Sequence, residues 1–257
     1  MNGPDPAACT ASIAPFEIRR GEPGCRRNQL IVPRPGVVQA DVEDDFHNFR
    51  VEIRHDGERV LELRTLSVRA PWTTCPTAGE FLAERMTGQR LDSLAEVDSP
   101  LLHCTHQYDI ALLAAAHALD TQPTLYSSFV SDRQSPTRTA ELYRNGRLEL
   151  AWEIVDGQIV SPGIGHGESL RKLSTWSADL PPDQREAARV LRRSAFIWGG
   201  RIFDYTLTPT ADKVVQTTGG CYTFQPVRSA QSVCTMRKLD FTDGGVPLRD
   251  RIEEAMG

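Results

Sequence analysis

The stretch His103-Cys-Thr-His-Gln-Tyr-Asp109 runs directly into Ile110-Ala-Leu-Leu-Ala-Ala-Ala-His117, and the rest of the chain is organised around it. The second part is apolar at every position before His117, which is typical of a helix buried on all sides. The first part would then be a helix N-terminus inside the protein, where free backbone N–H groups and the helix dipole favour negative charge. In that environment we expect the Cys104 thiol to have a lowered pKa and the His106 imidazole to stay neutral.

The composition is ordinary for a soluble globular protein: of 257 residues, 40% are hydrophobic and 25% are charged. This length allows one large domain or two small ones. The net charge of −5 argues against a nucleic-acid or anionic-membrane partner. No signal peptide and no apolar run of about 18 residues is visible, so we expect a cytoplasmic protein without a membrane segment. The six cysteines are widely spaced, which predicts free thiols.

Alternating apolar residues predict an antiparallel hairpin in the first half of the chain. Val51 and Ile53 alternate with charged residues, Asp56-Gly57 is a turn signal, and Leu61 and Leu63 continue the pattern. A three-residue loop would place Ile53 opposite Leu61 and Val51 opposite Leu63, which keeps one face of the hairpin apolar. We therefore predict that register.

The same alternation, extended towards the N-terminus, gives two ionisable residues the parity of the apolar face. Asp45 and His47 should point into the protein, with Asp45 near Arg69 if the pairing continues that far. A buried histidine is often satisfied by a backbone carbonyl, and a catalytic role is the alternative. The pattern alone leaves both open.

The second half of the chain predicts another hairpin, with Asn145-Gly146 as its turn. A two-residue loop there pairs Tyr143 with Leu148 and Glu141 with Leu150. Glu141 would then share a face with aromatic and aliphatic side chains, where a carboxylate is costly to bury. A place at the rim of a sheet is the simpler interpretation of Glu141.

Together, the elements predict an α+β protein with antiparallel sheets or a partial barrel, packed against a buried central helix and one long amphipathic helix. We expect one domain over residues 1–257, built from two β-rich halves of about 30–120 and 121–257, with residues 1–29 as an extended arm. Helices are expected at 78–87, 106–119, 182–198 and 247–256. Further strands are expected at 37–43, 125–131, 201–207, 214–217, 221–225 and 232–239.

Two stretches carry a resemblance to a known family. One runs from Asp44-Asp-Phe-His47 to Ala70-Pro-Trp-Thr-Thr-Cys-Pro76, and the other is Cys104-Thr-His106 with the helix after it. They resemble a bacterial family known as a domain of unknown function, with an Asp-x-x-His strand start, an Ala-Pro-x-x-x-Cys-Pro turn and a Gly-Cys-Thr-His helix start; here His103 replaces the glycine. The resemblance covers about residues 30–120 and names no reaction. It implies a place in bacterial aromatic-compound catabolism.

Cofactor and metal motifs are missing from the sequence. There is no Rossmann, Walker or haem motif, so we expect no cofactor. The side chains of His47, Cys75, Cys104 and His106 could bind zinc, but no pair has a diagnostic spacing, and we predict no tightly bound metal. Cys104 with His106 could instead form a nucleophile and its base.

Acid–base chemistry without a cofactor fits these residues best. His47, oriented by Asp45, would be the general base, and His106 would donate a proton or a hydrogen bond, with Cys104 as an alternative nucleophile. The predicted function is a lyase that eliminates a carbon–carbon or carbon–oxygen bond in a small aromatic or phenolic compound, in a chain that allows a homodimer. A non-catalytic ligand-binding protein and a zinc- or Cys-His-dependent hydrolase are the alternatives. Substrate contacts are expected from Tyr108, Tyr126, Arg133, Arg138, Tyr143 and Trp152.

Overall fold

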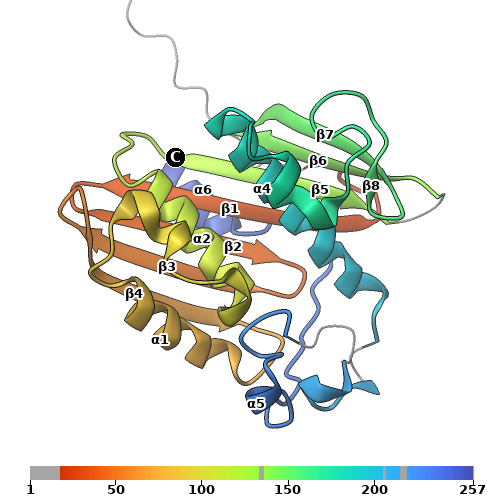
Figure 1. Cartoon of the computed structure of the whole chain (residues 1–257). Coiled ribbons are helices and arrows are strands. Elements are labelled where there is room, and N and C mark those ends of the chain that lie inside the picture. The colour runs from red at the N-terminus through yellow and green to blue at the C-terminus, as the bar shows by residue number, and fades with distance from the viewer. Residues whose placement is uncertain (1–17, 133–135, 205–206, 215–218, 257) are drawn as a thin grey trace, which may run out of the picture.

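The computed structural model describes residues 18–132, 136–204, 207–214 and 219–256. Its centre is an eight-stranded sheet with the order β4-β3-β2-β1-β5-β6-β7-β8, in which all neighbours are antiparallel (Figure 1). The predicted α+β class with antiparallel strands is therefore confirmed. The strands are β1 (Gly24–Arg34), β2 (Val37–Asp44), β3 (Asn48–His55), β4 (Val60–Arg69), β5 (Thr124–Ser131), β6 (Arg138–Arg144), β7 (Arg147–Val155) and β8 (Gln158–Ile159).

Three helices lie against the sheet at successive strands. α1 (Cys75–Met86) packs beside β4, α2 (Thr105–Ala116) packs on β1, β2 and β3, and α4 (Pro182–Ile197) packs on β5, β6 and β7 (Figure 1). Ten of the twelve residues of α2 are buried, which confirms the central buried helix. Short helical segments connect the larger elements: η1 (Leu91–Glu96), η2 (Pro100–Leu102), η3 (Leu170–Lys172), α3 (Leu173–Trp176), η4 (Trp198–Ile202), η6 (Ala211–Lys213) and α5 (Pro226–Ser229).

The alternation of side chains along β1 gives the molecule a third layer. Ile31 points into the main core, on the side of α2 and α4. Its neighbours Leu30 and Val32 pack instead in a separate cluster with Ile252 of α6 (Arg249–Met256). Successive residues of a strand point to opposite faces, so α6 covers the face of the sheet that α2 and α4 leave free.

Residues 24–29 begin the central strand β1, which corrects their assignment to an extended arm. All six residues are buried, although the four at 26–29 have polar side chains. Arg27 forms an ion pair with Asp44, and the Asn28 side chain donates to the carbonyl oxygen of Pro247 at 2.8 Å. A hydrophobic pattern could not reveal this strand, because these partners of Arg27 and Asn28 are distant in sequence.

The first hairpin has a different register from the predicted one. Ile53 lies opposite Leu63 rather than Leu61, because the loop has four residues and a register shift follows it. The Asp56 carboxylate closes the loop by accepting the backbone N–H groups two and three residues further on, at 2.9 and 2.8 Å. Ile53 still faces the core, since a shift of two residues preserves the face of a strand.

The second hairpin follows the prediction only next to its turn. Tyr143 pairs with Leu148 as expected, but a register shift before Tyr143 means that Glu141 does not lie opposite Leu150. Glu141 thereby leaves the apolar face and forms an ion pair with Arg19. The bulge therefore removes the cost of burying a carboxylate among apolar side chains.

The strands predicted after residue 200 are wrong wherever the structure describes them. The described parts of 201–207, 221–225 and 232–239 contain helical turns, coil and isolated bridges, such as those of Trp72 with Cys234 and Thr210 with Val233. The strand expected at 214–217 lies almost wholly outside the described residues. Tertiary packing often overrides the β-propensity of such segments.

Candidate active site

A three-residue turn between β2 and β3 carries the first imidazole of the site. Asp44 ends β2, and its Oδ1 accepts hydrogen bonds from the backbone N–H groups of Phe46 and His47, each at 2.9 Å. The same oxygen lies 2.8 Å from Nδ1 of His47. Aspartate favours such local bonds to the backbone that follows it. One carboxylate thus closes the turn and orients the His47 ring.

Arg69 of β4 holds the backbone of this turn. Its guanidinium donates to the carbonyl oxygens of Asp44 at 2.6 Å, Asp45 at 2.9 Å and His47 at 3.3 Å. The expected proximity of Arg69 and Asp45 is confirmed, although the contact uses the backbone of Asp45 and not its carboxylate. The position of the His47 ring therefore depends on β4 as well as on the turn itself.

The charge of Asp44 is balanced inside the protein. Asp44 is fully buried and forms an ion pair with Arg27 of β1, which is equally buried. Burial by itself would raise the pKa of Asp44, but His47 and Arg27 lower it to well below its usual range. The ionised carboxylate can accept a hydrogen bond from His47 when the proton of that ring is on Nδ1. This arrangement selects one histidine tautomer and leaves Nε2 as the basic nitrogen.

The second imidazole belongs to His106, the second residue of α2, and it stacks on His47. The ring centroids are 3.7 Å apart and the ring planes differ by 25°. Phe49 flanks both rings, with centroid distances of 5.7 Å to His47 and 6.1 Å to His106. Burial, together with His47 and Arg27, lowers the pKa of His106 well below its usual value, which agrees with the expected neutral imidazole.

Cys104 precedes α2 as its N-cap residue, with Sγ 3.9 Å from Nδ1 of His106. The prediction of an acidified thiol is wrong, because burial raises the pKa of Cys104 to about 12. The protonated thiol can donate to Nδ1 of His106, and the proton of that ring is then on Nε2. This Nε2 is buried and has no hydrogen-bond partner within the described part of the chain.

Asp45 does not orient His47, which corrects the prediction from strand parity. Its carboxylate forms an ion pair with Arg201 instead. Burial raises the pKa of Asp45 to about 7 despite this ion pair. β3 begins only at Asn48, so the alternation of the strand does not extend into the turn before it. The Asp-x-x-His spacing was the signal for Asp44, since aspartate side chains bond to the backbone two or three residues on.

Most residues predicted to contact a substrate lie apart from the imidazoles. Tyr143 is on the outward face of β6, where it donates to a carboxylate, and Trp152 is buried in the core. Arg138 stacks on the ring of Trp198, with the guanidinium carbon 3.2 Å from the ring centroid. Arg133 lies outside the described residues. These four residues therefore do not form one pocket.

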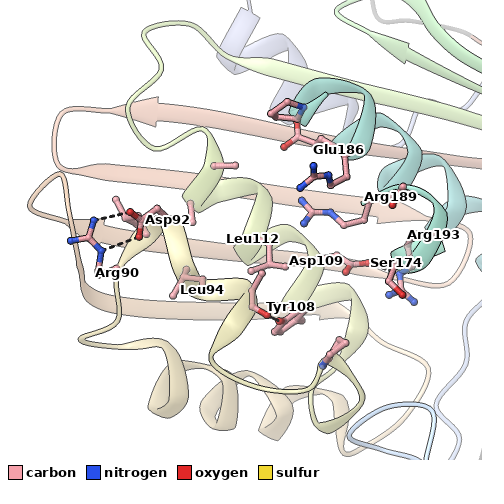
Figure 2. A pocket seen from close by; sticks show the side chains of 18 of the residues that line it. Arg90, Asp92, Leu94, Tyr108, Asp109, Leu112, Ser174, Glu186, Arg189 and Arg193 are labelled. Atoms are coloured by element: carbon pink, nitrogen blue, oxygen red, sulfur yellow. Dashed lines mark hydrogen bonds and ion pairs between the residues drawn. The ribbon is translucent and has the colours of Figure 1, made fainter. Parts of the chain in front are cut away.

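A cleft of about 1080 Å³ lies between α2 and α4, and one of the other two predicted contacts lines it (Figure 2). Tyr108 lines this cleft. Tyr126 does not line the cleft, but its hydroxyl donates at 2.6 Å to Oε1 of Glu186, which does. Neither His47 nor His106 is among the residues that line the cleft.

An ion pair between α2 and α4 connects the cleft with the imidazole pair. Asp109 follows His106 by three residues, so both lie on the same side of α2. Asp109 pairs with Arg193 of α4, and both line the cleft. Arg193 also helps to lower the pKa of His106. The Asp109–Arg193 ion pair therefore borders both regions.

The stacked imidazoles and Asp44 could also hold a metal ion. One ligand atom each from Asp44, His47 and His106 lies within 4.8 Å of the other two. Imidazole and carboxylate together are common ligands of divalent transition metals. Cys75 and Cys104, the thiols considered from sequence, are not part of this set. The neighbouring positive charge of Arg27 weakens the attraction of the set for a cation.

Two comparisons with known proteins found no relative of this chain. A scan against models of protein families found no match, and a search of curated proteins found none either. In the described residues, no helix has both the length and the apolar character to cross a membrane.

Proposed function

We propose that this protein is a cofactor-independent acid–base enzyme, a lyase that acts on a small aromatic or phenolic compound. The observation that carries the proposal is the stacking of His47 on His106, with ring centroids 3.7 Å apart. The Asp44 carboxylate is hydrogen-bonded to Nδ1 of His47. Two histidines of one cluster are thus held with different roles. A pair of titratable groups with divergent environments is the usual mark of a general base and a general acid.

The geometry suggests how the roles are divided. Asp44 accepts a hydrogen bond from the N–H group at Nδ1 of His47, so Nε2 of His47 is free to take a proton from a phenolic hydroxyl. The electrons of the phenolate then expel an alkoxide from the benzylic carbon of the side chain, and a carbon–oxygen bond breaks. The neutral His106 supplies the proton that the alkoxide needs from its Nε2, and the products are a quinone methide and an alcohol. The proton that His47 took from the phenol then returns to His106, so both imidazoles regain their starting forms. No electron leaves the substrate, so the reaction balances without an oxidant.

A ligand-binding protein without activity is the simpler alternative. It would be favoured if the two histidines were far apart or bonded only to backbone carbonyls. The structure instead supports the catalytic alternative, since the rings are in contact and His47 is bonded to a carboxylate with its own buried counter-ion. A histidine kept only for packing needs no such carboxylate.

A metal-dependent hydrolase is the second candidate, because Asp44, His47 and His106 offer three converging ligand atoms. Metal analysis of the purified protein separates the candidates. The acid–base proposal expects no stoichiometric metal and activity that survives a chelator. One bound equivalent of zinc, lost together with activity on chelation and in His106→Gln, would establish the hydrolase.

The direct test is a screen of phenolic compounds and their dimers with an oxygen substituent on the benzylic carbon. Product formation is followed by chromatography, with His47→Gln as the inactive control. We expect turnover by the wild type and at least about a hundredfold less by the variant. Equal turnover by both proteins, or none of any compound, would count against the lyase.

A further inference from the structure

The cleft between α2 and α4 has two chemically different walls (Figure 2). The wall from α2 and the residues after it is apolar and includes Leu112 and Leu119, with Leu94 of η1 beside them. Leu119 is 70% exposed although it lines a concavity. The opposite wall is a face of α4 rich in arginine. An apolar body with a charged end would match both walls.

The arginines of α4 form a stripe along one face of the helix. Arg185, Arg189 and Arg192 are spaced by four and three residues, which places them on the same side. All three line the cleft. Arg189 and Arg192 are half-buried, so their guanidinium groups are partly removed from water.

These cations have no carboxylate partners, whereas the carboxylates of the cleft are already paired. Asp109 pairs with Arg193, and Glu186 pairs with His117 and accepts the hydroxyl of Tyr126. In the described ranges, the other three arginines of α4 have no carboxylate oxygen within 4.0 Å. Arg185 and Arg192 donate only to backbone carbonyls.

Arg189 is the most available of the three. No hydrogen bond from its guanidinium is formed within the described ranges, and its charge is felt by Tyr108 and Glu186 inside the cleft. Burial, and after it the nearby Arg193, lowers the pKa of the adjacent Arg192. Burying cations without a counter-ion is costly, and an anion from solution would remove that cost.

We propose that the α2–α4 cleft binds a small amphipathic carboxylate, with its carboxylate on Arg189 and its apolar body against Leu112 and Leu119. Guanidinium groups bind carboxylates through paired N–H donors. The volume of the cleft is sufficient for a ligand of drug size. This binding site does not depend on the proposed lyase activity, and its test uses no turnover.

The test is fluorescence titration with dansylaminoundecanoate and with its methyl ester, which has the same apolar body without the charge. Arg189→Gln is the main variant, and Arg54→Gln is the matched control, because Arg54 is an exposed arginine of β3 outside the cleft. Leu119→Ser probes the apolar wall at a position exposed enough to leave the fold intact. Circular dichroism confirms that each variant is folded.

We expect the carboxylate to bind the wild type with one molecule per chain and to bind Arg189→Gln at least about tenfold more weakly. Arg54→Gln should bind like the wild type, and Leu119→Ser should weaken both probes. The ester should bind the wild type and Arg189→Gln equally. The proposal is overturned if the carboxylate does not bind, if it binds no better than the ester, or if the two arginine variants behave alike.

Discussion

The two ends of α2 show opposite ways of handling charge in a partly buried region. At its N-terminus, His106 stacks on His47, and the one ionised carboxylate there has its own buried arginine. Towards its C-terminus, α2 forms the apolar wall of a cleft whose other wall holds arginines without carboxylate partners. The charges of the first region are balanced within the protein, which suits the positioning of protons. The second lacks an anion and suits the reception of a ligand.

The largest effect is expected where the internal balance of charge is removed. Arg27→Leu leaves the Asp44 carboxylate buried without its counter-ion, which should cost about 3–5 kcal/mol of unfolding free energy. Urea denaturation measures this loss. The double variant Arg27→Leu with Asp44→Asn should recover part of it, since neither charge remains. A double variant as unstable as the single one would contradict the proposed balance.

The imidazole pair should affect turnover more than stability. His47→Gln and His106→Gln should each lower kcat at least about a hundredfold, because each removes one proton-transfer group. Steady-state kinetics on a substrate from the phenolic screen, with thermal melting alongside, measures both effects. Cys104→Ser is the control and should retain turnover, because the thiol is protonated. If Cys104→Ser is inactive but folded, the chemistry is covalent.

The adjacent carboxylates provide a sharper test of which one orients His47. Asp44→Asn should lower kcat at least about tenfold, because the amide no longer stabilises the protonated imidazole. Asp45→Asn should change kcat less than twofold, since Asp45 pairs with Arg201 instead. The pH dependence of kcat/KM should move only in Asp44→Asn. The reverse order would restore Asp45 as the orienting residue.

A smaller, pH-dependent effect is expected at the C-terminal end of α2. Burial alone would lower the pKa of His117, but the hydrogen bonds that it donates to Glu186 and Asp120 raise it above the unfolded value. The protonated form therefore stabilises the fold fully below about pH 6.5, and this stabilisation is lost as the pH rises through the higher folded pKa. His117→Gln should cost about 1–3 kcal/mol at pH 6 and less at pH 9. Denaturation at both pH values tests the sign.

The smallest effect is expected outside both regions. Glu141→Gln removes the ion pair with Arg19. Because the Arg19 side chain is 43% exposed, this change should cost less than about 1 kcal/mol. Urea denaturation at low and high salt measures it. A gain in stability would mean that Glu141 lies unpaired on the apolar face, as the predicted register had it, because the neutral amide is less costly to bury there.

Local signals in the sequence were enough for much of the fold. The apolar run at 110–116 predicted a helix buried on all sides, and the structure confirms it as part of α2. The Asn145-Gly146 turn predicted a hairpin, and Tyr143 does pair with Leu148. Such features depend on spacing within a few residues, which the sequence contains in full. The neutral state expected for His106 is present, but burial and the charges of His47 and Arg27 produce it, and these come from packing.

Long-range contacts decided the rest. The central strand β1 was hidden because Arg27 and Asn28 look like surface residues until Asp44 and Pro247 are placed beside them. The registers of both hairpins depend on bulges, which add one residue to one strand and leave no pattern in the sequence. The pKa of Cys104 is set by burial rather than by the helix N-terminus, and only packing decides burial. The sequence by itself therefore determined the elements that have strong local patterns, such as the buried helix and the two hairpins, and which residues could react. Only the tertiary structure decided that His106 stacks on His47 and that Arg185, Arg189 and Arg192 of α4 lack carboxylate partners among the described residues, because both depend on side chains brought together from separate strands and helices.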